Sequence, residues 1–334
     1  MVTETFDELG AQTRLLKGAY TGIAASTIGG ATLHSLCRVP VRGKQPSTTT
    51  LNKLLLMWQN VRYLIIDEYS MISRSFLSQI SSTLSLVMDR VRGYAEDIPF
   101  GGLNVIISGD FHQFPPVCSR KTAPLYWRAC TDDSNEESVG SELYSKFNKV
   151  VILKDQVRVT DAGWLDLLRH ARHGTCSAEH ISMLRSLLLG SSNCPDTDFT
   201  SRPWSNAVLV TPRHSVRNQW NIAASKECSI AMKTQLYVSN AEDTIQNRSL
   251  TLREQIALQM KGNVSTGPKD DRCRLSDCLL LAVGLKVMVT HNIDTAHQIA
   301  NGARGEIVRI ILDPREDPKK QDGAHDVELS YLPA

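Results

Sequence analysis

The chain has 334 residues, of which 42% are hydrophobic, so it can bury more than one core and is long enough for two domains. It contains no apolar run of about 18 residues and no apolar stretch after a basic N-terminus, which argues against a membrane-spanning or exported protein. A formal net charge of +2 is too small to indicate nucleic-acid binding by itself. The eight cysteines form no CxxC pair, as is typical of free thiols in a reducing compartment.

Short runs rich in β-branched residues predict strands that are buried on both faces, at 61–67, 103–110, 149–154, 206–212, 285–292 and 305–312. Apolar residues at helical spacing predict helices over 76–91, after a cap at Ser73 or Ser75, over 164–171, after a cap at Asp161, and over 216–224. Strands that alternate with helices predict a doubly wound α/β fold with parallel sheets.

One polar tract separates two such groups of elements. It covers 129–141, is rich in acidic residues and serine, and has no apolar periodicity. It therefore predicts a boundary near residue 145, with one α/β domain over 1–145, a second over 146–334 and a protease-sensitive link between them.

Two adjacent carboxylates, Asp67 and Glu68, follow the predicted strand 61–67. Open α/β sheets bind ligands at the carboxyl ends of their strands. In a nucleotide hydrolase the first acid holds Mg²⁺ and the second polarises the attacking water. An isolated acidic pair at a strand end can equally face solvent, so this motif alone leaves both interpretations open.

The next strand favours the chemical interpretation. VIISGDFHQFPPV carries Asp110 at the end of the strand, Gln113 three residues later, and then a rigid proline pair. A glutamine at this place can reach a γ-phosphate or the attacking water. The alternative is a proline-stiffened loop that leaves the sheet, and the acidic pair 43 residues earlier makes that alternative less favoured.

A glycine-rich stretch, TGIAASTIGGATLHS over 21–35, precedes both strands. Glycines let backbone N–H groups approach phosphate oxygens, and hydroxyl groups add neutral donors. Such a loop is also an ordinary connection between a helix and a strand, so the pattern is weak by itself.

Taken in order, TGIAASTIGGATLHS, LIIDEYS, FGGLNVIISGDFHQFPPV, LKDQVRV and IANGARGEIV resemble the motifs of superfamily-one DNA helicases of the Pif (petite integration frequency) type, including the helicase part of Helitron transposons. The resemblance covers about residues 15–315. It implies two RecA-like domains of the P-loop NTPase type that bind ATP and Mg²⁺ between them. It also implies five-prime to three-prime movement on single-stranded DNA, action at duplex junctions, an intracellular location in nucleus or mitochondrion, and roles in repair, recombination or telomere maintenance.

The resemblance assigns roles to individual residues. Asp67 and Glu68 match the Mg²⁺ and water-activating acids, and Gln113 matches the glutamine of the GDxxQ motif, with Asp110 beside it at the nucleotide. Arg158 matches the arginine that the second domain offers to the γ-phosphate; without the resemblance, a basic residue on a solvated face would be favoured. Where the family has glutamine after this arginine, Val159 stands here.

The DNA contacts that the resemblance implies come from both ends of the chain. They are Thr21, Gly22, Thr32 and His34 in the first domain and Asn301 and Gly302 in the NGxxG motif of the second, where Arg304 is implied to contact the nucleotide. Without the resemblance, NGARGEIV predicts only a turn that leads into a strand.

Two motifs of the family have no counterpart here. The Walker A string GxxxxGKS/T does not precede TGIAAS, and no last family motif precedes the final LSYLPA. The sequence therefore predicts a first domain incomplete at its N-terminus and a second incomplete at its C-terminus, through a truncated gene model or a decayed copy. Two rival hypotheses stay open: a DNA-binding remnant without turnover, and an unrelated nucleotide switch with a protein partner.

The spacing of His170, His173 and Cys176 could place three metal ligands on one helix face. Structural zinc prefers four ligands, and no fourth is near in the sequence. Solvated residues at a helix end are the favoured interpretation.

Overall fold

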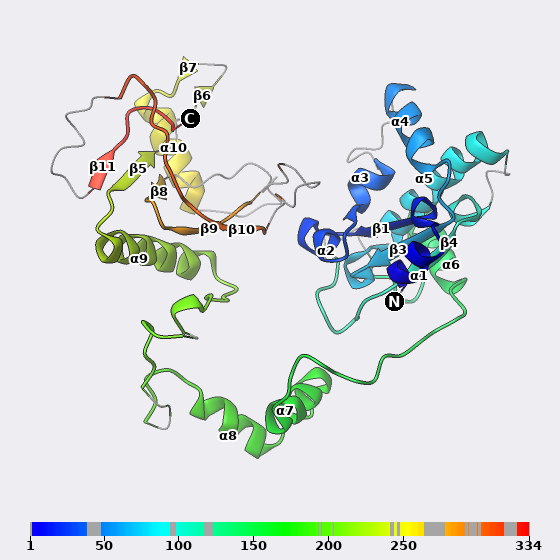
Figure 1. The fold of residues 1–334 in the computed structure, drawn as a ribbon, viewed down its shortest axis with the longest axis horizontal. Helices are drawn as coiled ribbons and strands as arrows, with labels where there is room; N and C mark the ends of the chain where they lie inside the picture. Colours follow the sequence, from blue (N-terminus) through cyan, green and yellow to red (C-terminus); the bar gives the residue numbers. More distant parts are fainter. Residues whose placement is uncertain are drawn as a thin grey trace. The chain divides into compact units, whose positions relative to one another are not determined.

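The structure is a computed structural model that describes residues 2–38, 48–93, 98–116, 123–192, 194, 196–202, 204–240, 244–245, 248–263, 278–290, 293, 299, 302–316 and 326–333 (Figure 1). It divides into two compact units. Unit 1 consists of Met1–Ser201 with Val289–Ala303, and unit 2 of Arg202–Met288 with Arg304–Ala334. We describe each unit by itself.

Unit 1 contains a four-stranded sheet and its covering helices. Its elements are α1 (Val2–Glu8), η1 (Gln12–Arg14), β1 (Leu15–Ala19), α2 (Gly22–Thr27), β2 (Ala31–Thr32), α3 (Leu33–Cys37), α4 (Thr48–Trp58), β3 (Tyr63–Asp67), η2 (Tyr69–Met71), α5 (Arg74–Arg92), η3 (Pro99–Gly102), β4 (Asn104–Ile107), α6 (Asn135–Ser145), α7 (Ala162–His173) and α8 (Ala178–Ser186).

All four strands of this sheet are parallel, in the order β2-β1-β3-β4. The register pairs Ala19 with Asp67 and Ile66 with Ile107, so the carboxyl ends of β1, β3 and β4 lie at one edge. The buried side chains of α3, α4 and α5 pack with those of β3 into one core that includes Trp58, Leu64 and Leu84. The predicted strands at 61–67 and 103–110 are therefore confirmed as β3 and β4.

Helix α5 forms where the apolar spacing predicts it. Ser73 caps its start, because the Ser73 hydroxyl accepts a hydrogen bond from the Phe76 N–H at 3.1 Å. Gly93 ends it in a left-handed conformation with φ 67°. The predicted cap at Asp161 is confirmed in the same way, since the Asp161 carboxylate accepts the Trp164 N–H at the start of α7.

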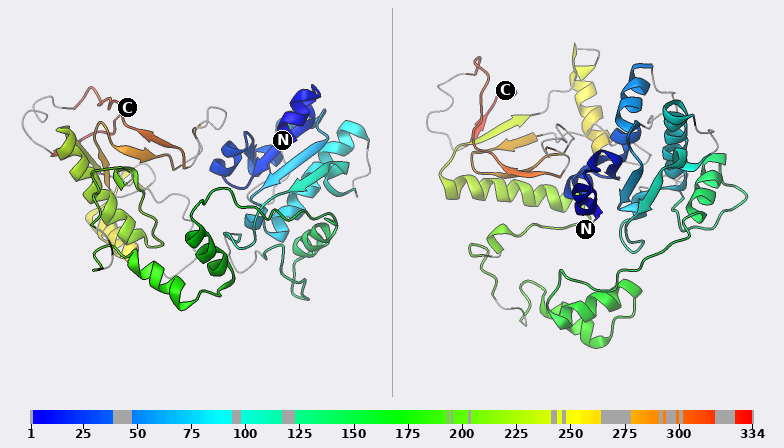
Figure 2. Two further views of the ribbon diagram at one scale, coloured as in Figure 1. Left: turned by 60° about the horizontal axis from the view of Figure 1, so that its bottom comes forward. Right: turned by 45° about the vertical axis from the view of Figure 1, so that its right-hand side comes forward.

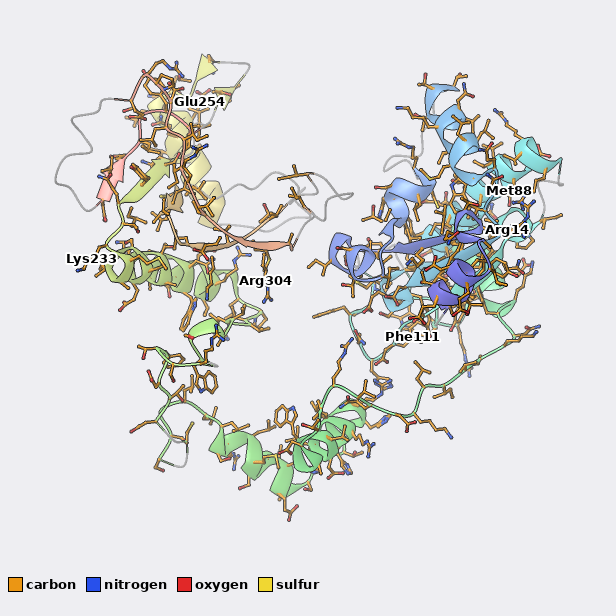
Figure 3. All side chains as sticks on the ribbon, in the orientation of Figure 1. Arg14, Met88, Phe111, Lys233, Glu254 and Arg304 are labelled. Atoms are coloured by element: carbon orange, nitrogen blue, oxygen red, sulfur yellow. The ribbon has the colours of Figure 1, made fainter. Side chains whose placement is uncertain are left out.

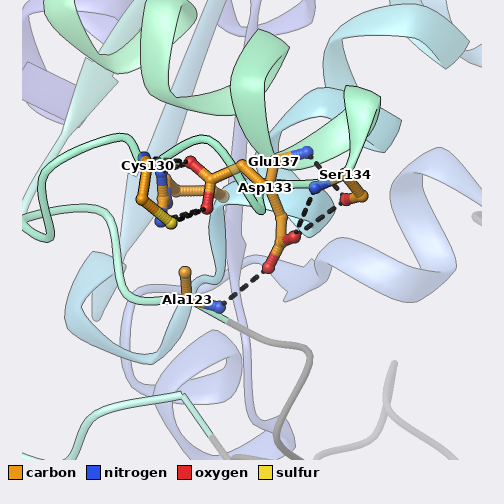
Figure 4. Close-up of polar contacts among 6 residues, drawn as sticks. Ala123, Cys130, Asp133, Ser134 and Glu137 are labelled. Carbon is orange, nitrogen blue, oxygen red and sulfur yellow. Dashed lines mark hydrogen bonds and ion pairs between the residues drawn. The ribbon is translucent and has the colours of Figure 1, made fainter.

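The acidic tract at 129–141 is part of unit 1 rather than a link. Ser134 and Glu137 form a capping box at the start of α6, and the Glu137 carboxylate also accepts the Ala123 N–H (Figure 4). Asp133 accepts hydrogen bonds from the Cys130 N–H and thiol and pairs with both terminal nitrogens of the buried Arg74 on α5. These polar contacts hold α6 against α5 within unit 1, and the compact units divide after Ser201.

Unit 2 contains strands of two to five residues, a helix of 19 residues and a helix of 12 residues. Its elements are η4 (Trp204–Asn206), α9 (His214–Met232), β5 (Leu236–Asn240), β6 (Thr244–Ile245), β7 (Arg248–Ser249), α10 (Leu252–Asn263), β8 (Cys278–Leu281), β9 (Lys286–Met288), β10 (Arg304–Glu306) and β11 (Asp326–Glu328). Figure 2 shows α9 from two further sides.

The described strands of unit 2 form a mixed sheet, β11-β5-β8, in which β11 is parallel to β5 and β8 is antiparallel to it. Strands β9 and β10 form an antiparallel pair, as do β6 and β7. The predicted helix at 216–224 is confirmed within α9, and the predicted strands at 285–292 and 305–312 are found in shortened form as β9 and β10.

The strands predicted at 149–154 and 206–212 are wrong for this structure, which gives neither segment strand geometry. A strand needs a neighbour to pair its backbone groups, and neither segment has a ladder partner among the described residues. Their side chains stay in solvent as a result: Leu153 is 89% exposed and Val210 is 91% exposed.

Candidate active site

The two predicted acids lie at the carboxyl edge of the parallel sheet. Asp67 is the last residue of β3, and Glu68 follows it in a left-handed backbone conformation, φ 54° and ψ 45°. This conformation is costly for a residue other than glycine and is found where the surrounding structure holds it. Here the Tyr69 N–H donates to the Ser108 carbonyl at 3.0 Å, which ties the exit of β3 to that of β4.

The backbone at the end of β4 comes unusually close to that of η2. A Cβ atom on Gly109 would lie 2.8 Å from the backbone nitrogen of Tyr69 and 2.7 Å from a carbon of its ring. Only glycine fits there without a shift of the backbone. Glycine at this position therefore lets the segment after β4 lie directly beside Glu68.

Charges of both signs meet around Glu68. Burial raises the pKa of the Glu68 carboxyl, and the carboxylates of Asp67 and Asp110 raise it further, while Arg158 lowers it. A carboxyl group whose pKa is raised beside other carboxylates is typical of a site that binds a cation or moves a proton. The structure thus brings together four of the residues that the sequence predicted, from two strand ends and from the segment before α7.

A tight turn after β4 presents Gln113. The Asp110 side chain accepts the His112 N–H at 3.0 Å, and the Asp110 carbonyl accepts the Gln113 N–H at 2.9 Å. Gln113 itself is exposed, as a side chain that meets a ligand must be. Phe111, labelled in Figure 3, anchors the turn from the other side by ring contacts with Tyr69, Tyr126 and Tyr144.

Asp110 is already paired, which the sequence did not predict. The Arg172 guanidinium on α7 donates to both of its carboxylate oxygens, with Nη2 at 2.6 Å from Oδ1. These hydrogen bonds hold the pKa of Asp110 down at about 2. No local pattern indicated this pair, because Arg172 and Asp110 are 62 residues apart and lie in elements that had no predicted contact.

The turn that carries Arg158 has its own support. The Oε1 atom of Gln156 accepts the backbone N–H groups of Arg158 and, at 2.9 Å, of Val159. The Arg158 side chain is exposed and acts on Glu68 electrostatically. Gln156 therefore shapes the backbone from which Arg158 projects.

Two of the residues near the N-terminus that are implied to contact DNA also stabilise the local structure. The Thr21 hydroxyl caps α2 by accepting the Ala24 N–H, and the buried Thr32 hydroxyl caps α3 by accepting the Ser35 N–H, both at 3.3 Å. Gly22 is the first residue of α2 and is buried. The hydroxyls of Thr21 and Thr32 therefore order two short helices at this edge of the sheet.

His34 is exposed and lies in an aromatic group. Its ring stacks on Phe76 at 4.6 Å between centroids and meets the edge of Tyr20 at 5.4 Å. Burial of one side of the ring lowers the pKa of His34, so the imidazole is neutral at pH 7. A neutral, exposed ring next to other rings is a surface on which a base could stack.

Gly302 has a left-handed φ of 94°, and its N–H donates to the Val289 carbonyl. A Cβ atom on Gly302 would lie 1.9 Å from Cδ1 of Ile23 on α2, so Gly302 packs beside the segment that holds Gly22. Asn301 lies outside the described residues. Arg304, the first residue of β10 (Figure 3), belongs to unit 2 and is described within that unit only.

The described residues contain one group that could hold a metal ion, and it differs from the one weighed in the sequence. Asp166, His170 and His180 have ligand atoms within 4.8 Å of one another. However, His180 Nδ1 accepts the Ser177 N–H. The ring proton is then on Nε2, which donates a hydrogen bond to the Asp166 carboxylate at 2.9 Å. With both nitrogens of His180 engaged, the arrangement is a helix cap and a hydrogen bond rather than a metal site.

A parallel sheet with acids at its carboxyl edge, a glutamine turn after the next strand and an arginine nearby is an arrangement typical of nucleotide-binding α/β domains. The family model described as PIF1-like helicase matches residues 6–186, more than half of the chain. The chain therefore belongs to the PIF1-like helicase family.

Curated relatives and solved structures agree with this assignment. The ATP-dependent DNA helicase PIF1 of Danio rerio is 27% identical over 306 residues, which cover 87% of this chain and 39% of the relative. The ATP-dependent DNA helicase RRM3 of Saccharomyces cerevisiae is 30% identical over 175 residues, which cover 51% of this chain and 22% of the relative. The matched part of the chain thus corresponds to 39% of the length of the PIF1 relative and 22% of the length of the RRM3 relative.

The crystal structure of a Bacteroides Pif1 helicase in complex with ADP-AlF3 and ssDNA has a TM-score of 0.54 and 22% identity, covering 89% of this chain and 60% of that one. The Candida albicans Pif1 helicase structure has a TM-score of 0.53 and 20% identity, covering 96% and 62%. These similarities confirm the predicted RecA-like α/β fold class. Among the described helices, none is long and apolar enough to cross a membrane.

Proposed function

We propose that the chain is part of the motor of an ATP-dependent DNA helicase, which couples ATP hydrolysis to movement along single-stranded DNA and unwinding at duplex junctions. The observation that carries the proposal is the meeting of Asp67, Glu68, Asp110 and Arg158 at the carboxyl edge of a parallel sheet. Members of this family are described as ATP-dependent DNA helicases, and one solved relative holds an ATP-like ligand together with single-stranded DNA.

The residues fit Mg²⁺ and a nucleotide, because hard cations prefer the oxygen ligands that Asp67 and its neighbours offer. Bound Mg²⁺ would neutralise charge on the β- and γ-phosphates. Glu68 has a raised pKa and is suited to accept a proton from the attacking water. Gln113 would orient that water or sense the γ-phosphate, and Arg158 would stabilise the charge that develops there.

The surface near α2 and α3 is the proposed place for single-stranded DNA. Thr21 and Thr32 order the backbone there, His34 offers a ring, and Gly302 lies against Ile23 beside them. Phosphate contacts and base stacking bind single strands without reading their sequence. By family, the parent protein would act inside the cell, in nucleus or mitochondrion, in repair, recombination or telomere maintenance, with functional domains over 1–145 and 146–334.

The second candidate is a DNA-binding remnant without turnover. The 334 residues contain no GxxxxGKS/T string, and such a loop supplies the backbone cradle and lysine that hold the phosphates. We expect ATP hydrolysis by the chain alone to stay near background, far below a typical rate of about 10 per second. Joining a phosphate-binding loop ahead of residue 15 should raise it by orders of magnitude.

The experiment compares DNA-stimulated ATP hydrolysis by that extended chain with the same chain carrying Glu68→Gln or Arg158→Ala. Each substitution should lower the rate at least about 100-fold while single-stranded DNA binding persists. Hydrolysis that is indifferent to both substitutions would refute the assigned roles. DNA binding without any hydrolysis in the extended chain would favour the remnant.

A further inference from the structure

Arg172 lies in the last turn of α7 and forms an ion pair with Asp110, the first residue of the turn that carries Gln113. Its two terminal nitrogens donate to the two oxygens of Asp110 in a fork. This geometry is the strong form of an ion pair, because two parallel hydrogen bonds fix direction as well as distance. A single-point contact between exposed charges would contribute little.

The same carboxylate also shapes the turn. Asp110 Oδ1 accepts the His112 N–H at 3.0 Å while it accepts from Arg172 Nη2 at 2.6 Å, so one oxygen joins the helix to the turn. A second contact lies close by, since the rings of His112, two residues after Asp110, and His173, the residue after Arg172, meet edge to face at 5.3 Å between centroids. The end of α7 is therefore fastened to the turn by two neighbouring contacts.

Among the described arginines of α7, only Arg172 forms hydrogen bonds with Asp110. Arg169 lies one turn earlier on the helix, is exposed, and acts on Asp166 rather than on Asp110. Because both oxygens of Asp110 are engaged by Arg172, the Asp110 carboxylate is turned toward the helix. Asp110 is thus better suited to hold the turn than to contact the nucleotide itself.

We propose that Arg172 is a positioning residue: through Asp110 it fixes the turn 110–113, so that Gln113 is presented in one orientation to the γ-phosphate. The proposal rests on the function proposed above for Gln113. It also makes α7 the element through which a rearrangement outside the sheet can reach the nucleotide. A shift of α7 that breaks the fork would release the glutamine turn without touching Asp67 or Glu68.

The test is hydrogen–deuterium exchange of the His112 and Gln113 amides, measured on the full chain without nucleotide. Arg172→Ala should speed exchange of both amides by about threefold or more, the order expected when an ordered ion pair is lost. Arg172→Lys keeps the charge but loses the fork and should restore part of the protection. Arg169→Ala, the matched control on the same helix, should leave these amides unchanged.

A double-mutant cycle shows whether Arg172 acts through Asp110. Asp110→Asn keeps an oxygen that can accept the His112 N–H but loses the ion pair, so Arg172→Ala should add nothing in that background. Unchanged exchange in Arg172→Ala, equal effects of Arg169→Ala, a lysine variant that exchanges as fast as the alanine variant, or fully additive effects in the cycle would each overturn the proposal.

The catalytic consequence is measured in a form of the chain that hydrolyses ATP. Arg172→Ala should lower kcat by about tenfold and leave KM within about twofold, because a misplaced Gln113 weakens the transition state more than the bound substrate. A change in KM alone would overturn the proposal. The exchange experiment needs no nucleotide. If the chain extended by a phosphate-binding loop never hydrolyses ATP, the proposed function is refuted, and the exchange test still decides the role of Arg172.

Discussion

Gly140 of α6 lies directly on the backbone of Arg74 of α5. A Cβ atom added to Gly140 would lie 1.9 Å from the Arg74 carbonyl oxygen and 2.5 Å from its carbonyl carbon. Rigid backbone rather than a flexible side chain occupies the space, so neither helix can yield locally. The two helices approach closely because this position has no side chain, and the polar contacts at the start of α6 form around that approach.

Gly140→Ala should therefore destabilise unit 1. We expect a cost of about 1–3 kcal/mol, the range for overpacking, seen as a lower midpoint in thermal or urea unfolding. Gly163→Ala is the matched control, because that Cβ would meet its nearest neighbour, a Met183 carbon, at an ordinary 3.4 Å. Alanine at 163 should leave stability unchanged or raise it by up to ~1 kcal/mol. Equal unfolding midpoints for the two variants would contradict the close packing.

The Asp133 carboxylate should make the stability of unit 1 depend on pH. The Cys130 N–H, the Cys130 thiol and Arg74 lower its pKa below the ordinary 3.8. A folded-state pKa below the unfolded one adds stability above the unfolded pKa, and that stability is lost as pH falls through the lowered value. Asp133→Asn should thus lower the unfolding midpoint at pH 7, and the difference from the unchanged chain should shrink below pH 3.8.

Asp132→Asn, on the exposed neighbouring residue, is the control for this pH dependence and should have little effect at either pH. A difference for Asp133→Asn that grows on acidification would show that the carboxylate does not stabilise the fold.

The Glu68 carboxyl should set the acid limit of ATP hydrolysis in a form of the chain that turns over. Burial and the nearby carboxylates raise its pKa, and a proton acceptor must be ionised to act. The rate should therefore fall as pH drops through a value above the ordinary 4.5 of a glutamate. Glu68→Gln should remove that limb together with about 100-fold or more of the rate. If the residual rate of Glu68→Gln fell with pH in the same way, another group would be responsible for the pH dependence.

Binding of single-stranded DNA should weaken steadily as salt increases. Each phosphate neutralised contributes a slope of about −0.7 in a plot of log affinity against log salt concentration. Fluorescence anisotropy with labelled oligonucleotides of different sequence measures this directly, and His34→Ala should weaken binding to all of them by a similar factor, since stacking is tolerant of sequence. Binding that is independent of salt, or confined to one sequence, would contradict the proposed surface.

Much of unit 1 could be predicted from the sequence, because its strands and helices carry strong local patterns. The buried run before Asp67, the apolar stripe of α5 and the caps at Ser73 and Asp161 all reappear in the structure. The convergence of Asp67, Glu68 and Arg158 was predicted from family motifs and not from spacing, since Arg158 lies 90 residues beyond Glu68 and only tertiary structure brings their charges together.

The rest depended on contacts that leave no local pattern. The acidic tract was interpreted as a link, but Ser134 and Glu137 are a capping box, and its acids satisfy backbone donors and Arg74. The pairing of Arg172 with Asp110 had no signal at all, because an arginine near a helix end usually serves the helix dipole. The run at 149–154 was predicted from β propensity alone, which cannot create a strand without a partner.

Glu68 occupies a left-handed backbone conformation that costs a residue with a Cβ atom about 1–2 kcal/mol and that glycine, which has no Cβ, adopts without this cost. At position 68, glycine would therefore favour thermal stability, whereas the proposed hydrolysis needs the glutamate carboxylate. A library of variants selected only for a higher thermal unfolding midpoint should be enriched in glycine at position 68. The selected proteins would be more stable but would not hydrolyse ATP. Engineering of this chain for robustness has to hold residue 68 fixed from the outset.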